Sequence, residues 1–221
     1  MGIKPLYYFF NDERFVFASE LKALLSYEIP KELDSTSLFQ YFQHNYIAGP
    51  STVFKNVFKL KPGTFLQVTD KGVIQNDYYS IPYNKNEIVS IPTYSEAQQG
   101  ISEMLDESVK LRMISDVPLG AFLSGGIDSS VIVALASKYT DKLSTFSIGY
   151  RDEPLFDETT YANSVAEKYK TNHTSFSLTN DDLFSVLYKV LDYTDEPFAD
   201  SSALAVNILC QHTRKHVTVA L

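Results

Sequence analysis

The sequence predicts an α/β protein in which a small α+β unit precedes a parallel, doubly wound sheet. Residues 1–80 contain two hairpin patterns, and residues 118–221 alternate strand-like with helix-like apolar runs. Such alternation is typical of a parallel sheet covered by helices. Ser124-Gly125-Gly126 forms a glycine turn between the first of these strands and its helix. Ligands of such sheets bind beyond the carboxyl ends of the strands, where this turn falls.

Length and composition limit the class of protein. The chain has 221 residues, of which 44% are apolar, enough to bury a sizeable core. A net charge of −8 without a Lys and Arg cluster argues against a nucleic-acid partner. The single cysteine, Cys210, rules out an intrachain disulfide framework and suits a reducing compartment. With no membrane-length apolar run and no signal-peptide pattern, we expect a cytoplasmic protein without a membrane partner.

The N-terminal unit is expected to hold two hairpins and two helices. Residues 1–10 run into a strand that forms the first hairpin with residues 14–19, and residues 64–68 and 72–79 form the second. A short helix covers residues 20–26, and a longer one begins near Asp34. No group of residues in this unit carries recognisable chemistry.

Residues 81–92 are interpreted as a linker because they contain proline and asparagine but few core residues. Thr93 and Glu96 have capping-box spacing, so a helix starts there. We expect its apolar residues to be core positions: Ile101, Met104, Leu105, Val109, Leu111 and Met113. The sheet strands are then expected at residues 119–123, 143–150, 173–178 and 217–221, with helices beginning near residues 128, 157, 180 and 201.

The glycine turn is suited to binding phosphate. The first amides of a helix lack intrahelical partners, and the helix dipole adds roughly half a positive charge there. Glycines allow an anion to approach such amides closely. The candidate residues are Ser124, Gly125, Gly126, Asp128, Ser129 and Ser130. Asp128 would repel phosphate unless a cation such as Mg²⁺ lay between them, so Asp128 is the candidate metal ligand. The alternative is a tight turn capped by serine or aspartate.

The string Ser-Gly-Gly-Ile-Asp-Ser-Ser at residues 124–130 resembles the pyrophosphate loop of the ATP pyrophosphatase family. Residues 2–8, 17–24, 49–54 and 60–63 are similar to the closing part of the glutaminase domain of glutamine-dependent asparagine synthetases. The resemblance implies a partial glutaminase (amidotransferase type 2) domain with an α+β N-terminal-nucleophile fold at residues 1–80. A linker at 81–92 and a partial asparagine synthase ATP-binding domain of the ATP pyrophosphatase type at 93–221 would follow.

The resemblance also implies an activity. The parent protein would amidate a carboxylate, aspartate to asparagine, through an acyl-adenylate, using ATP, Mg²⁺ and ammonia from glutamine. Its substrates would be small molecules, and a homodimer is possible. The glutaminase cysteine of the family has no counterpart, since residue 2 is Gly2 and Cys210 lies in the other half. We therefore expect a chain truncated at both ends, with no identifiable catalytic residue and with its own turnover in doubt.

Further site residues follow from the resemblance. Leu123 and Ile148 match nucleotide-contacting positions, and Gly149 would let adenine or ribose approach the backbone. Asp157 would serve Mg²⁺ or ribose, or else cap a helix. Residues 195–202 resemble a stretch near the acceptor site, which makes Ser201 and Ser202 possible contacts; a loop with a helix N-cap is the alternative.

Cys210, His212 and His216 lack zinc-type spacing and are interpreted as helix-surface residues. Three other functions stay open. A GMP synthetase-like or a β-lactam synthetase-like enzyme would share the glycine loop, although the N-terminal hairpin disfavours the first. A non-catalytic nucleotide-binding remnant is the third.

Overall fold

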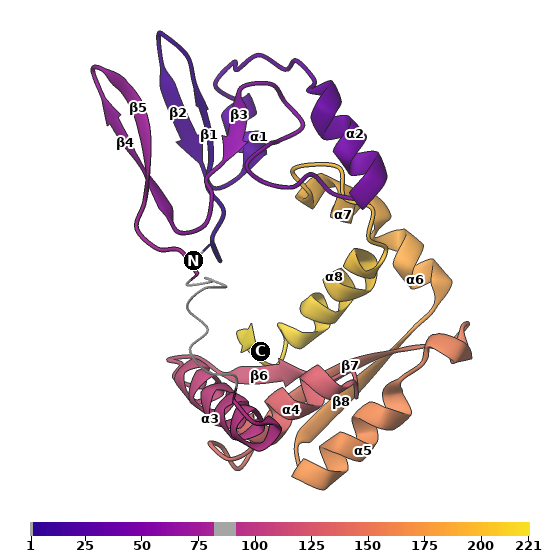
Figure 1. Cartoon of the computed structure of the whole chain (residues 1–221). Helices are drawn as coiled ribbons and strands as arrows, with labels where there is room; N and C mark the ends of the chain where they lie inside the picture. Colours follow the sequence, from indigo (N-terminus) through magenta and orange to yellow (C-terminus); the bar gives the residue numbers. More distant parts are fainter. Residues whose placement is uncertain (1, 82–91) are drawn as a thin grey trace. The chain divides into compact units, whose positions relative to one another are not determined.

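The computed structural model describes residues 2–81 and 92–221. The chain divides into two compact units that are not contiguous in sequence (Figure 1). Unit 1 combines Met1–Glu87 with Leu191–Asp200, and unit 2 combines Ile88–Val190 with Ser201–Leu221. In the parts of the chain that are described, no helix has the length and apolar character needed to span a membrane.

Unit 1 contains both expected hairpins and both expected helices. An antiparallel sheet of order β2-β1-β3 comprises β1 (Tyr7–Phe10), β2 (Phe15–Ala18) and β3 (Val57–Lys59). The second hairpin pairs β4 (Thr64–Thr69) with β5 (Gly72–Asp77). The helices are α1 (Leu21–Leu25) and α2 (Ser35–His44), and Asp34 caps α2. The core packs α1 against the sheet and gathers Phe9, Leu21, Leu24, Ile29, Ile47, Val53 and Val57.

Leu191–Asp200 is bound into unit 1 by two acidic side chains. The Asp195 carboxylate accepts hydrogen bonds from the amides of Leu21 (2.9 Å) and Lys22 (3.3 Å), so it caps α1. Glu196 accepts from the Val53 amide at 2.8 Å and forms a largely buried ion pair with Lys59. Burial, followed by the charges of Glu196 and Asp195, raises the pKa of Tyr7 to about 12. The segment is therefore a structural part of unit 1.

Unit 2 is an α/β fold with a parallel sheet, as expected. The strands are β6 (Leu119–Phe122), β7 (Ser144–Tyr150), β8 (Asn172–Leu178) and β9 (Val219–Ala220), in the order β8-β7-β6-β9. All three strand pairs are parallel. The helices are α3 (Tyr94–Arg112), α4 (Ile127–Ala136), α5 (Thr159–Tyr169), α6 (Asn180–Ser185), α7 (Leu187–Tyr193, which ends in unit 1) and α8 (Ser202–Thr213).

Helices lie on both faces of this sheet (Figure 1). On one face, Ala121 and Leu123 pack against α4 and α5 through Val133 and Ala162. On the other face, Leu178, Ile148 and Tyr150 pack against α6 and α8. Apolar residues on both faces explain why β6, Leu-Gly-Ala-Phe, reads as a continuous apolar run rather than as an alternating pattern.

Several expectations about unit 2 were wrong. Val109 is the buried residue of α3, whereas Ile101, Met104 and Leu111 are more than half exposed, and Leu105 is also exposed. The reason is that α4 is the main neighbour of α3, so only a narrow stripe with Val109 and Met113 reaches the core. The helix expected from residue 180 is interrupted at Val186, which separates α6 from α7.

The proposed linker lies almost wholly outside the described residues.

Candidate nucleotide site

The glycine turn lies between β6 and α4, where its side chains bond to one another. The buried Leu123 continues the β6–β7 pairing by donating its amide to the Phe146 carbonyl at 2.8 Å. Ser124 Oγ and Ser129 Oγ lie 2.9 Å apart, and the Gly126 amide donates to Ser124 Oγ at 3.2 Å. Ser129 Oγ also donates to the Gly126 carbonyl at 3.2 Å. The two hydroxyls therefore hold the bend in one shape.

The start of α4 has no side-chain cap. Gly126 is the N-cap residue, and no side chain accepts from the first helical amides. In contrast, side chains cap α2, α3 and α6 through Asp34, Thr93 and Thr179. The first turn is also accessible, since Ile127 is 84% exposed and Asp128 is exposed. Because these amides have no side-chain cap and the turn is accessible, they are candidates for binding an anion.

Two polar side chains in this turn favour a ligand. Ser130 Oγ is buried and has no hydrogen-bond partner within residues 2–81 and 92–221. Buried hydroxyls in native proteins are usually paired, so this oxygen could accept or donate to a further group. Asp128 brings a carboxylate to the first turn of α4. The residues present thus fit a phosphate accompanied by a cation.

The two glycines of the turn have different roles. Gly125 has φ of +84°, and a Cβ there would lie 2.5 Å from Tyr161 Cβ and 2.6 Å from the Ala162 nitrogen. A side chain at residue 125 would therefore collide with α5 and be strained. Gly126 has φ of −67°, and the nearest atom to a Cβ added there would be Ser124 Oγ, at 3.3 Å. Close packing on α5 explains the first glycine without a ligand.

An apolar cavity of about 190 Å³ adjoins the turn. Leu123 and Ile148, both expected at a nucleotide site, line it together with Ser124. The remaining lining comes from the ends of β6 and β7, from the segment before α5 and from α8: Phe122, Phe146, Ser147, Tyr150, Phe156, Glu158 and Leu209. A planar apolar ring would fit between these side chains while an attached anion reached α4.

Sequence reasoning missed Phe156, Glu158 and Leu209. Each comes from an element that approaches β7 only in the folded chain. Phe156 lies in a short 3-10 helix, η2 (Pro154–Phe156), and Leu209 lies on the sheet-facing side of α8. Tyr150 could have been found, since it lies two residues beyond Ile148 and strand side chains alternate between faces.

Gly149 and Asp157 make contacts with the segment at the start of α5. A Cβ on Gly149 would lie 2.7 Å from Thr159 Cγ2 and 2.9 Å from Asp157 Oδ1. Gly149 thus leaves room for the turn before α5, and it does not line the cavity. Asp157 Oδ1 accepts from the Thr159 amide at 2.9 Å, and hydrogen bonds from Thr159 lower the pKa of this carboxyl. Asp157 Oδ1 therefore accepts from the first residue of α5, although Glu158 is the N-cap residue of that helix.

The remaining expected residues do not join this site. Ser201 and Ser202 lie at the start of α8, and neither lines the cavity. Cys210 is exposed, His212 packs on Phe176, and His216 packs on Phe146. Among the described residues, no group of three His, Cys, Asp or Glu side chains is arranged to hold a metal ion.

Comparison with known proteins identifies two families. Residues 100–221 match the asparagine synthase family, and residues 1–79 match a glutamine amidotransferase domain. A Bacillus subtilis protein named asparagine synthetase [glutamine-hydrolyzing] 1 is 34% identical over all of this chain. A Methanocaldococcus jannaschii protein, also named as a glutamine-hydrolysing asparagine synthetase, is 37% identical over all of it. A Gibberella zeae protein named Amidase chry2 is 31% identical over 62% of this chain. The chain spans 34%, 43% and 20% of these three relatives.

Proposed function

Because the chain belongs to the asparagine synthase family, we propose that its glycine turn and adjoining cavity bind Mg-ATP for the amidation of a carboxylate. The single observation that carries this proposal is the uncapped, exposed start of α4 beside an apolar cavity. Phosphate needs the first feature and adenine needs the second. The fold would then be of the ATP pyrophosphatase type, with residues 93–221 forming part of the ATP-binding domain.

The proposed roles follow from where each residue lies. Leu123 and Ile148 contact the adenine within the cavity. Ser124, Gly125, Gly126, Ser129 and Ser130 surround the β and γ phosphates, with the first amides of α4 as donors. Asp128 would supply a carboxylate ligand to Mg²⁺, which would neutralise charge on the phosphates.

In the proposed reaction, the acceptor carboxylate attacks the α-phosphate and releases pyrophosphate. Ammonia then displaces AMP from the acyl-adenylate. Negative charge develops on the leaving pyrophosphate, and preorganised amides stabilise such charge without reorganisation. The chain's own contribution is the α4 N-terminus, whose first amides have no side-chain cap and need not break one to bind the pyrophosphate.

The acceptor and the source of ammonia are proposed from the relatives' names. Aspartate is the proposed acceptor, since the Bacillus subtilis relative is named an asparagine synthetase. Glutamine is the proposed ammonia source because residues 1–79 match a glutamine amidotransferase domain. Residues 1–80 would then be part of that domain.

Titration calorimetry of Mg-ATP tests the site. Asp128→Asn should weaken binding on the order of tenfold, because one ligand to the cation is lost. The matched control is Asp141→Asn, an exposed aspartate in the loop after α4, which should leave the affinity unchanged. Equal affinity of Asp128→Asn and the unaltered chain would remove Asp128 from the site.

Exchange of labelled pyrophosphate into ATP tests the reaction. It should be measured on this chain and on a polypeptide extended at both ends to the length of its relatives. Exchange in the extended protein identifies an enzyme. Binding of Mg-ATP without exchange in either protein would instead support a nucleotide-binding remnant.

A further inference from the structure

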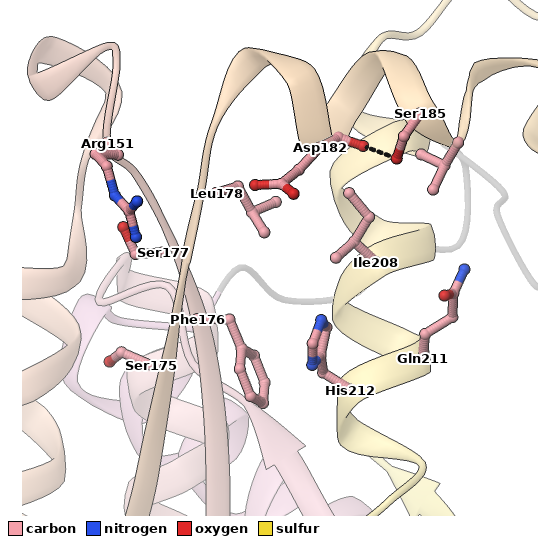
Figure 2. A pocket seen from close by; sticks show the side chains of 11 residues that line it. Arg151, Ser175, Phe176, Ser177, Leu178, Asp182, Ser185, Ile208, Gln211 and His212 are labelled. Carbon is pink, nitrogen blue, oxygen red and sulfur yellow. Dashed lines mark hydrogen bonds between the residues drawn. The ribbon is translucent and has the colours of Figure 1, made fainter.

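A second cavity, of about 500 Å³, lies beside β8 (Figure 2). Its walls come from the edge strand β8, from α6, from α8 and from Arg151, which follows β7. It shares no lining residue with the nucleotide cavity. Its volume lies within the usual range of small-molecule sites. Like the nucleotide cavity, it is found near the carboxyl ends of the strands, where α/β sheets bind ligands.

Backbone and ring contacts fix the walls of this cavity. The Arg151 amide donates to the Leu178 carbonyl at 2.8 Å, which joins the ends of β7 and β8. Asp152 Oδ2 accepts from the Asn180 amide at 2.8 Å, which holds the start of α6 to the same loop. On the other side, the rings of Phe176 and His212 lie 4.7 Å apart and join β8 to α8. The cavity is therefore formed before any ligand binds.

Two opposite charges lie at the same end of the cavity, away from the Phe176 and His212 rings (Figure 2). The Arg151 side chain makes no hydrogen bond within residues 2–81 and 92–221, and no ion pair within 4.0 Å joins it to Asp182. The Asp182 carboxylate accepts from the Thr179 amide (2.8 Å) and hydroxyl (2.7 Å), both through Oδ2. Oδ1 has no hydrogen bond in the described part of the chain. One guanidinium and one carboxylate oxygen can therefore receive a ligand.

Asp182 is ionised at neutral pH. Hydrogen bonds from Thr179 lower its pKa, and the nearby positive charge of Arg151 lowers it further by a smaller amount. A simple anion drawn to Arg151 would be repelled by Asp182, and a simple cation would be repelled by Arg151. A ligand with both charges satisfies both groups. The rest of the lining is mixed: Phe176, Leu178, Val186 and Ile208 are apolar, and Ser175, Ser177, Ser185, Gln211 and His212 are polar.

We propose that this cavity binds a free α-amino acid as its zwitterion. The ligand carboxylate pairs with the Arg151 guanidinium, its ammonium group donates to Asp182 Oδ1, and its side chain lies against Leu178 and Ile208. This site is separate from the nucleotide cavity and does not require ATP. Binding here would allow an amino acid to act on the protein independently of Mg-ATP.

Nuclear magnetic resonance titration of the ¹⁵N-labelled chain tests the proposal. L-leucine is the probe because its side chain is apolar, and L-glutamine tests a polar side chain of similar size. N-acetyl-L-leucine lacks the ammonium charge, and L-leucinamide lacks the carboxylate. We expect L-leucine or L-glutamine to shift the amides of Ser177, Asp182 and Gln211. The two L-leucine derivatives should bind at least about tenfold more weakly than L-leucine, since each loses a charge-assisted hydrogen bond.

The variant Arg151→Gln should raise the dissociation constant about tenfold or more. Arg112→Gln, the same change at the end of α3, should leave it unchanged. Far-ultraviolet circular dichroism of both variants shows whether they are folded. The proposal is overturned if neither amino acid binds, if the derivatives bind as tightly as L-leucine, or if Arg151→Gln binds like Arg112→Gln. Calorimetry with Mg-ATP is a separate measurement, so failure here leaves the proposed nucleotide site untouched.

Discussion

The helices α1 and α4 begin in opposite ways. At α1, the first two amides are bonded to the Asp195 carboxylate, which comes from a segment 174 residues along the chain. At α4, a glycine is the N-cap residue and no side chain accepts from the first turn. Both helices follow a β-strand. At each start, burying the first amides without a hydrogen-bond partner would cost free energy.

The difference separates a structural helix start from one that we propose as a ligand site. A carboxylate at α1 satisfies the amides and complements the helix dipole permanently. Such a carboxylate at α4 would exclude phosphate. Asp128 carries the same charge, but it lies inside the first turn rather than before it, and it accepts no hydrogen bond from the first amides of α4. Four changes can break or sharpen this comparison.

The largest expected effect is at the bend before α4. Gly125→Ala should destabilise the protein by about 3–5 kcal/mol, because a Cβ would collide with α5 in a backbone conformation that alanine resists. Gly126→Ala is the control, with an expected cost below about 1 kcal/mol at its ordinary φ. Urea denaturation measures both. Equal costs would show that packing on α5 does not fix the bend.

The second effect is in residues 191–200, the segment whose Asp195 caps α1. Glu196→Ala should cost about 2–4 kcal/mol, since it leaves the Lys59 ammonium and the Val53 amide without this partner in a largely buried place. Glu32→Ala removes an exposed ion pair with Lys55 and should cost at most about 1 kcal/mol. Urea denaturation again compares them, and a negligible cost at Glu196 would contradict the proposed structural role of residues 191–200.

The third change compares the two helix starts directly. Asp195→Ala should cost about 1 kcal/mol, the usual contribution of an N-cap. Asp128→Ala should change the stability by only a few tenths of a kcal/mol, since Asp128 makes no capping bond. Thermal unfolding of both variants measures the contrast. If Asp128→Ala were the more destabilising, the start of α4 would be structural after all.

The smallest effect concerns pH. Burial lowers the pKa of His173, whose ring bonds to Thr145 Oγ1 (2.9 Å) and Ser147 Oγ (3.1 Å). The unfolded state therefore binds a proton more readily, and stability should fall as pH falls through about 6.5. In His173→Asn this loss between about pH 7 and pH 5 should shrink. Carboxyls with lowered pKa, such as Asp106, lose their contribution to stability only at a lower pH than His173 does. The loss of stability from His173 can therefore be distinguished from theirs.

Short-range signals in the sequence predicted most of the elements. The capping box of Thr93 and Glu96 lies within four residues, and the structure contains it. The glycine turn, its strand and its helix were equally local, as were the hairpins. Leu123 and Ile148 were located by the resemblance, and the structure brings both to one cavity.

Long-range packing accounts for what was missed. β3 has only three residues and forms because β1 pairs with it across about fifty residues of chain. The contact of Asp195 with α1 has no sequence signal, because the acidic pair Asp195-Glu196 before Pro197 also suits a loop. The exposure of Ile101 and Met104 could not be predicted either, since an apolar stripe shows that a helix can be buried but does not identify its neighbours.

The interleaved order of the two units has a practical consequence for dissecting this protein. Any contiguous piece of gene that encodes β1 to β5 alone omits Asp195 and Glu196, so α1 would be made without its cap and Lys59 without its counterion. Cutting at residue 81 would therefore give a weakened domain. To be expressed on its own, unit 1 would need residues 191–200 restored, either joined to it through a loop or co-expressed as a separate peptide.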